Sequence, residues 1–108
     1  MQIRFVYMTA GSREEAATIG RALVEERLAA CVNIISPMQS IYRWQGKIEE
    51  DSEVVMIAKT TARHMDRLIS KVRELHSYEC PCIVAWEIVD GNAPFLEWIG
   101  REVADRGE

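Results

Sequence analysis

CVNIISPMQSIYRWQGKIEEDSEVVMIAKT, residues 31–60, is the stretch that decides the fold. It indicates two long strands, Cys31–Trp44 and Lys47–Thr60, joined by a turn at Gln45-Gly46. Pro37 cannot donate a ladder hydrogen bond, so we expect a bulge or an edge there. Each arm has about 13 residues and at ~3.3 Å per residue spans roughly 40 Å, whereas a domain of this size is only about 26–30 Å across. The hairpin must therefore overhang the rest of the domain.

The segments that precede this hairpin predict a strand and a helix. Ile3–Thr9 alternates with the two-residue period of a strand that has one strongly apolar face. Ser12 and, three residues later, Glu15 form a capping-box signature, in which each side chain accepts a backbone N–H that would otherwise be unpaired. We expect the helix that begins there to run to about Leu28.

The segments that follow the hairpin predict a helix, a strand and a final helix. Thr61 can cap the first helix, whose apolar residues recur at helical spacing: Met65, Leu68, Ile69, Val72 and Leu75. Cys82–Trp86 is a continuous apolar run, as expected of a strand covered on both faces. Asn92 can cap the last helix, with Pro94 in its first turn.

Together these elements predict an α+β fold in one domain of residues 1–108. The order is that of a ferredoxin-like β-α-β-β-α-β sandwich with a long central hairpin and an additional C-terminal helix. Two right-handed crossovers place both core helices on one face of a four-stranded antiparallel sheet. The other face of the sheet stays open.

Composition narrows the classes of function. Hydrophobic residues make up 48% and charged residues 28%, typical of a soluble globular protein. A formal net charge of -4 gives no attraction for nucleic acid or an anionic membrane, and no apolar run approaches the ~20 residues of a membrane span. Cys31, Cys80 and Cys82 are an odd number, so free thiols are expected. We expect a cytoplasmic protein.

The tip of the hairpin predicts self-association. Ile41, Tyr42 and Trp44 would be exposed there beside unpaired strand edges, which in a soluble protein require partners. An edge that pairs with a different edge of the next subunit generates a ring when the rotation closes. These considerations do not fix the number of subunits.

Four segments in order along the chain resemble the CutA family of divalent-cation tolerance proteins: Leu28–Asn33, Tyr42–Glu49, Glu53 through Thr60, and His76–Pro81. The resemblance spans nearly the whole chain. It implies a homotrimer with the architecture of the PII signalling proteins, whose subunits pair strands through the long hairpins. It also implies binding of copper or another divalent cation.

The sequence departs from the family pattern at several positions. Ser77 stands where relatives have proline, and Cys82 stands where they have glutamate, so that a carboxylate has become a thiol. Met8 replaces a cysteine of some relatives, and Leu75 replaces a second histidine. A copper site of the family type would be incomplete here.

The candidate metal ligands are His76, Cys80, Cys82 and Met8. In an extended segment residues 80 and 82 point to the same side, where two sulfurs would suit Cu(I) or Zn(II). The alternatives are that Cys82 packs as a small hydrophobe, that His76 caps a helix, and that Met8 belongs to the core. Cys31 is expected to be a structural thiol, and His64 to be solvated.

Four further residues are candidates for an inter-subunit cleft or interface: Tyr42, Trp44, Lys59 and Tyr78. The acidic stretch Glu49–Glu53 could bind a hard cation, but its side chains alternate and cannot all converge, which favours a solvated edge. Metal binding has three alternatives as the function of this protein.

An enzyme would use Gly11-Ser12-Arg13 as an anion cradle like that of the acylphosphatases, yet no catalytic partner accompanies it. An RNA-recognition domain lacks the aromatic residues required on its third strand. The main alternative is a PII-like signalling or interaction module that binds a small ligand or an unidentified partner protein at subunit clefts without metal. We therefore expect a binding protein and not an enzyme.

Overall fold

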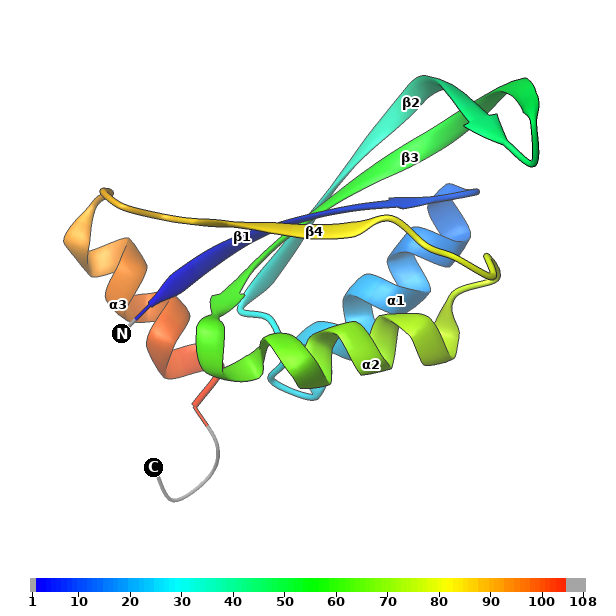
Figure 1. Cartoon of the computed structure of the whole chain (residues 1–108). Helices are drawn as coiled ribbons and strands as arrows, with labels where there is room; N and C mark the ends of the chain where they lie inside the picture. Colours follow the sequence, from blue (N-terminus) through cyan, green and yellow to red (C-terminus); the bar gives the residue numbers. More distant parts are fainter. Residues whose placement is uncertain (1, 105–108) are drawn as a thin grey trace.

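The computed structural model describes residues 2–104, so the two ends of the predicted domain, residues 1 and 105–108, lie outside the described part. The elements in chain order are β1 (Ile3–Ala10), α1 (Arg13–Glu25), β2 (Cys31–Trp44), β3 (Lys47–Thr61), a 3-10 turn (Ala62–His64), α2 (Met65–Leu75), β4 (Ile83–Glu87) and α3 (Ala93–Glu102). The strands form one antiparallel sheet in the order β2-β3-β1-β4 (Figure 1). This order confirms the predicted topology, including the additional last helix.

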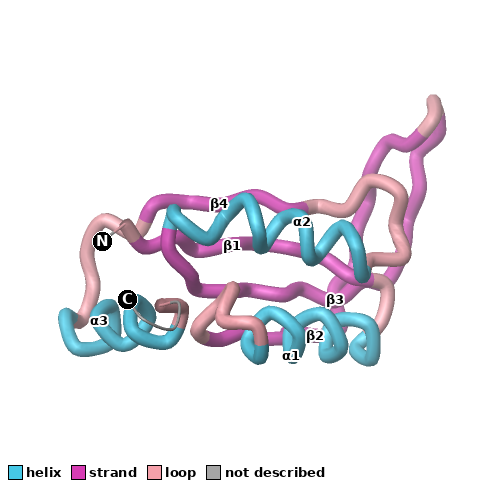
Figure 2. The backbone as a smooth tube through the Cα atoms, turned by 90° about the horizontal axis from the view of Figure 1, so that it is seen from below, coloured by secondary structure: helices cyan, strands magenta, loops and turns pink. Residues whose placement is uncertain are grey.

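The main core lies between the sheet and helices α1 and α2, which run side by side beneath it (Figure 2). Strands β1 and β3 contribute alternate residues from the middle of the sheet, and the helices contribute fully buried apolar side chains. These core residues are Val6, Met8 and Ala10 from β1, Val54, Met56 and Ala58 from β3, Ala16, Ile19 and Leu23 from α1, and Leu68 and Val72 from α2. A second, smaller cluster holds α3 against the end of the sheet farthest from the hairpin tip, and it contains Ile3, Ala30, Ile99 and Val103. None of the helices within residues 2–104 is long and apolar enough to cross a membrane.

The start of α1 confirms the capping box, whereas its end differs from the expectation. The Ser12 hydroxyl accepts the Glu15 N–H (3.1 Å), and the Glu15 carboxylate accepts the N–H of Gly11 (3.2 Å). The helix ends at Glu25, earlier than predicted, because Arg27 adopts a left-handed φ of 58°. The Leu28 N–H then folds back onto the Leu23 carbonyl (2.8 Å).

The β2-β3 hairpin extends well beyond the body of the domain, as predicted (Figure 1). The molecule measures 47 × 27 × 22 Å, and its long dimension exceeds the size of a compact domain of this length. The β2-β3 register shifts between Ile35 and Met38, which is the irregularity predicted at Pro37. Gln45 and Gly46 turn the chain with φ values of 49° and 81°.

Strand β4 corrects one expectation. It begins at Ile83 and lies at an edge of the sheet, with Val84 and Trp86 49% and 53% exposed, so the prediction of a strand covered on both faces is wrong for the single chain. Side chains alternate along a strand, so Ile83 packs on the helix side while Val84 and Trp86 face the opposite side. There Trp86 meets Phe5 edge to face, with ring centroids 5.6 Å apart.

Candidate functional site

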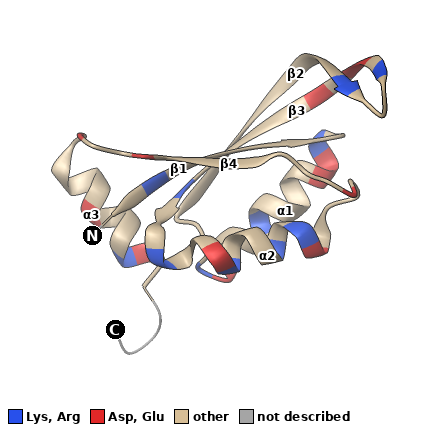
Figure 3. Ribbon diagram, in the orientation of Figure 1, with Lys and Arg blue, Asp and Glu red and all other residues tan. Residues whose placement is uncertain are grey.

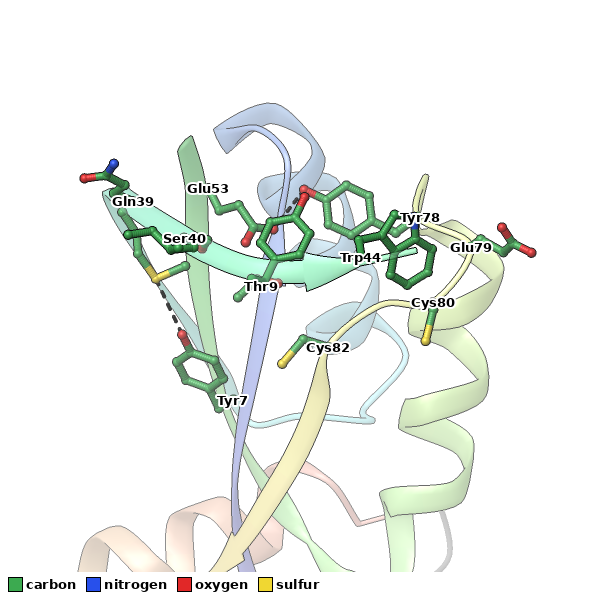
Figure 4. A pocket seen from close by; sticks show the side chains of 13 residues that line it. Tyr7, Thr9, Gln39, Ser40, Trp44, Glu53, Tyr78, Glu79, Cys80 and Cys82 are labelled. Carbon is green, nitrogen blue, oxygen red and sulfur yellow. Dashed lines mark hydrogen bonds between the residues drawn. The ribbon is translucent and has the colours of Figure 1, made fainter. Parts of the chain in front are cut away.

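A groove of about 670 Å³ lies between the overhanging hairpin, the end of β1 and the segment before β4 (Figure 4). The hairpin contributes residues 38–42, Trp44 and Glu53 to its lining. The opposite side comes from the end of β1, through Tyr7 and Thr9, and from the segment between α2 and β4, through residues 78–80 and Cys82. Three parts of the chain that are distant in sequence therefore meet at this groove.

Five of the eight predicted site residues line the groove: Tyr42, Trp44, Tyr78, Cys80 and Cys82. Met8 does not, because it lies on the helix side of β1 and is fully buried in the core. Lys59 does not either, since its ammonium donates a hydrogen bond to the Asn33 side chain on the open face of the sheet. The structure thus gathers the aromatic residues and two of the thiols, but separates Met8 and Lys59 from them.

Two phenols of the groove donate hydrogen bonds to carboxylates, and these carboxylates are acidic groups of the site. The Tyr78 hydroxyl donates to Glu53 (2.9 Å), and the Tyr42 hydroxyl donates to Asp51 (Figure 4 shows the first pair). The Asp51 hydrogen bond raises the pKa of Tyr42 to about 12. Burial, together with Glu53, raises the pKa of Tyr78 as well. Both phenols therefore stay protonated while the carboxylates beside them remain available as charged acceptors.

The pairing of the two groove thiols at a metal stays a prediction. Residues 80 and 82 precede β4 in a segment without regular secondary structure, and in the single chain their sulfur atoms point in different directions (Figure 4). Burial and the negative charge of Glu53 raise the pKa of the Cys82 thiol. Within residues 2–104 no group of three or more His, Cys, Asp or Glu side chains is arranged to hold a metal ion.

His76 is buried below the groove, with both ring nitrogens engaged. One nitrogen, Nε2, lies 2.7 Å from the Thr9 carbonyl oxygen, and Nδ1 accepts the N–H of Tyr78 (3.0 Å). A carbonyl only accepts, so Nε2 donates the hydrogen of this bond. The imidazole thereby positions Tyr78, whose ring packs 4.6 Å from it, and its predicted role as a ligand stays a prediction.

Glu15 is the residue of this region that the sequence analysis did not assign to the site. Its carboxylate accepts N–H groups from Gly11 (3.2 Å) and Ser77 (2.7 Å), and so joins the start of α1 to the segment that carries Tyr78. Burial alone would raise its pKa, but the hydrogen bonds from Ser77 and Gly11 and the nearby His76 together lower it. The capping-box signal identified Glu15 but could not reveal the contact with a segment 62 residues away.

The third cysteine and the second histidine of the chain lie elsewhere. Cys31 is a half-buried free thiol at the start of β2, opposite Lys59 in the β2-β3 register. His64 was expected to be solvated, but its side chain is buried at 2% exposure, and its Nδ1 lies 2.7 Å from the Thr61 hydroxyl. His64 is the last residue of the 3-10 turn before α2, and it is the buried residue of that turn.

The family described as CutA1 divalent ion tolerance protein matches residues 4–102. This chain belongs to the CutA family. A CutA protein of Thermus thermophilus is 50% identical over 94 residues, which cover 87% of this chain and 91% of that protein. Human CutA is 46% identical over 99 residues, covering 92% of this chain but only 55% of the human protein, so the chain spans about half of that relative.

Solved CutA structures have the same architecture. The Thermus thermophilus protein superposes with a TM-score of 0.91 at 47% identity, covering 93% of this chain and 97% of that one. A CutA described as periplasmic, from Archaeoglobus fulgidus, gives 0.92 at 44% identity, covering 94% and 99%. These CutA neighbours confirm the ferredoxin-like α+β fold.

Proposed function

We propose that this protein acts in divalent-cation tolerance as a homotrimer, and that it binds copper or another divalent cation at the groove. The observation that supports the site most is that two thiols and a carboxylate line the same groove. They belong to Cys80, Cys82 and Glu53. Sulfur suits Cu(I) and Zn(II), and a carboxylate adds charge. The described residues of one chain do not complete a ligand set, so the proposal requires water or a neighbouring subunit to supply further donors.

The exposed hairpin supports the homotrimer. Ile41 and Ile48 are 65% and 66% exposed, and Trp44 is 44% exposed. Val84 and Trp86 on the open face of the sheet are exposed as well. Several large apolar side chains exposed on one chain favour an interaction surface, whereas a single exposed one would not. A second and a third copy would cover this surface and bring other side chains to the groove.

Metal binding through Cys82 should depend on pH. Its pKa is raised by burial and by Glu53, so the thiol is protonated at neutral pH and an entering cation must displace that proton. We expect affinity for Zn(II) or Cu(I) to rise as pH rises toward the thiol pKa.

Equilibrium dialysis of the reduced protein with Cu(I), Cu(II) and Zn(II) tests the proposal. Cys80→Ser and Cys82→Ser should each weaken binding by about tenfold or more, because each removes one of few soft donors. Cys31→Ser is the matched control, since it removes a thiol at the far end of the sheet. Equal binding by all four proteins, or none by the parent, would contradict a groove site. His76→Ala is less informative, because it also removes the hydrogen bond that positions Tyr78.

A second candidate function is a PII-like module that binds a small ligand or a partner protein at subunit clefts without metal. The size and aromatic lining of the groove favour it, since about 670 Å³ lies within the ~300–1,000 Å³ of small-molecule sites. Both candidates describe a binding protein and not an enzyme. The Ser12 hydroxyl at the possible anion cradle already accepts the Glu15 N–H as a helix cap.

The cytoplasm is part of the proposal. Three unpaired cysteines support a reducing compartment, in which thiols persist. Fractionation of the source cells would decide, and recovery of the protein outside the cytoplasm would contradict this location.

A further inference from the structure

We infer that the groove binds a small organic cation, an ammonium group with an apolar body and no anionic group beside it. The inference deepens the second candidate function by naming the class of ligand. It does not depend on the metal site, because it uses the aromatic and acidic residues of the groove and not its thiols.

Aromatic side chains from separate parts of the chain form much of the groove lining. They are Tyr7 on β1, Tyr42 and Trp44 on β2, and Tyr78 before β4. An organic ammonium group is attracted to the negative face of such rings, most strongly to that of tryptophan. Trp44 is 44% exposed in the single chain, so the rest of its own chain leaves part of the ring uncovered.

The charges at the groove have one sign. Glu53 and Glu79 line it, and Asp51 lies beside it through its hydrogen bond with Tyr42. None of its lining residues in the described part of the chain is lysine or arginine. Arg43 lies between Tyr42 and Trp44, but side chains alternate along a strand, so it points to the other face. A concave surface with charge of one sign concentrates ions of the opposite sign.

Tyr42 and Tyr78 remain neutral rings under physiological conditions. Hydrogen bonding to Asp51 raises the pKa of Tyr42 to about 12, and burial and Glu53 raise that of Tyr78. Their hydroxyls are committed to carboxylates, which fixes the direction of the rings. The groove is also much larger than a bare metal ion needs, which leaves room for the apolar body of an organic ligand.

Three probes of matched shape test the inference by isothermal titration calorimetry on the full chain. Choline carries the ammonium charge, 3,3-dimethyl-1-butanol has the same shape without it, and phosphocholine adds an anion beside it. We expect choline to bind about tenfold more tightly than the neutral alcohol, and phosphocholine to bind more weakly than choline. Binding of the alcohol as tight as that of choline would overturn the cation requirement. No binding of choline at tens of millimolar would overturn the site itself.

Variants assign any binding to the groove. Glu53→Gln keeps an acceptor for Tyr78 but removes the charge, and Trp44→Leu removes the ring; each should weaken choline about tenfold. Glu97→Gln removes one exposed carboxylate from α3 and should leave choline affinity unchanged. The double variant Cys80→Ser, Cys82→Ser should keep choline binding, which separates this result from failure of the metal proposal. Equal weakening by Glu97→Gln and Glu53→Gln would show an effect of net charge alone and overturn the inference.

Discussion

Glu15 joins the start of α1 to the segment that shapes the groove. Its side chain is only 17% exposed and accepts two backbone N–H groups, from Gly11 and Ser77. Ser77 lies between His76 and Tyr78, and the His76 ring accepts the Tyr78 N–H. By holding Ser77, the Glu15 carboxylate therefore supports both neighbouring side chains. At the scale of single residues, the groove is therefore held from below by an ionised acid.

Replacing Glu15 tests this support. Glu15→Gln keeps one acceptor oxygen but replaces the other by an amide that cannot accept, so we expect a loss of about 1–3 kcal/mol in the free energy of unfolding at pH 7. The pKa of Glu15 is lowered from 4.5, so its contribution is present above pH 4.5 and is lost as pH falls through the folded-state pKa. Urea unfolding at fixed protein concentration should show the gap between parent and variant closing as pH falls below 4.5.

Glu14→Gln is the control for that measurement. It also lies in the first turn of α1 and removes the same charge from the helix start, but its side chain is exposed. A loss of stability as large as that of Glu15→Gln would show that the helix dipole, and not the link to Ser77, explains the effect.

At the scale of elements, helix α2 follows its local pattern closely. Of the predicted apolar positions, Leu68 and Val72 are fully buried and Met65 packs against the core, whereas Leu75 at the end is 37% exposed. Strand β4 does not follow its pattern in the single chain. A continuous apolar run predicts burial on both sides but does not reveal whether the covering surface belongs to the same chain or to another copy.

Two leucines of α2 provide a matched comparison. Leu68→Ala should lower the free energy of unfolding by about 2–5 kcal/mol, because it leaves a cavity in the main core. Leu75→Ala should cost less than about 1 kcal/mol, since that side chain is partly in solvent. Chemical denaturation of both variants checks the difference, and equal losses would contradict the assignment of the buried face of α2.

Features that depend on neighbours in the chain were predicted from the sequence better than features that depend on distant segments. The capping box, the hairpin with its irregularity at Pro37, and the α2 stripe depend on neighbours in the chain, and the structure has each of them. The groove depends on three distant segments, so only Tyr42, Trp44, Tyr78 and the two thiols were identified from the sequence. Tyr7 and the link from Glu15 to Ser77 were not. The two sulfurs lie in a segment without regular secondary structure, where the two-residue period of a strand is a weaker guide to side-chain direction.

At the scale of the whole molecule, the long hairpin and the uncovered sheet face dominate the shape. The hairpin makes the chain 47 Å long, and Ile41, Ile48, Val84 and Trp86 are each about half exposed or more. Membership of the CutA family and the close superposition on CutA structures place this surface in a known architecture. Residues of the same hairpin line the groove of the proposed cation sites, so these sites depend on whether neighbouring copies cover the hairpin.

Sedimentation equilibrium at micromolar concentration tests the homotrimer on which this account depends most directly. We predict a single species with three times the 12.3 kDa mass of the chain, because three copies would shelter the hairpin and the open sheet face. A well-behaved particle of 12.3 kDa would contradict the account, together with the proposal that subunits complete the site at the groove.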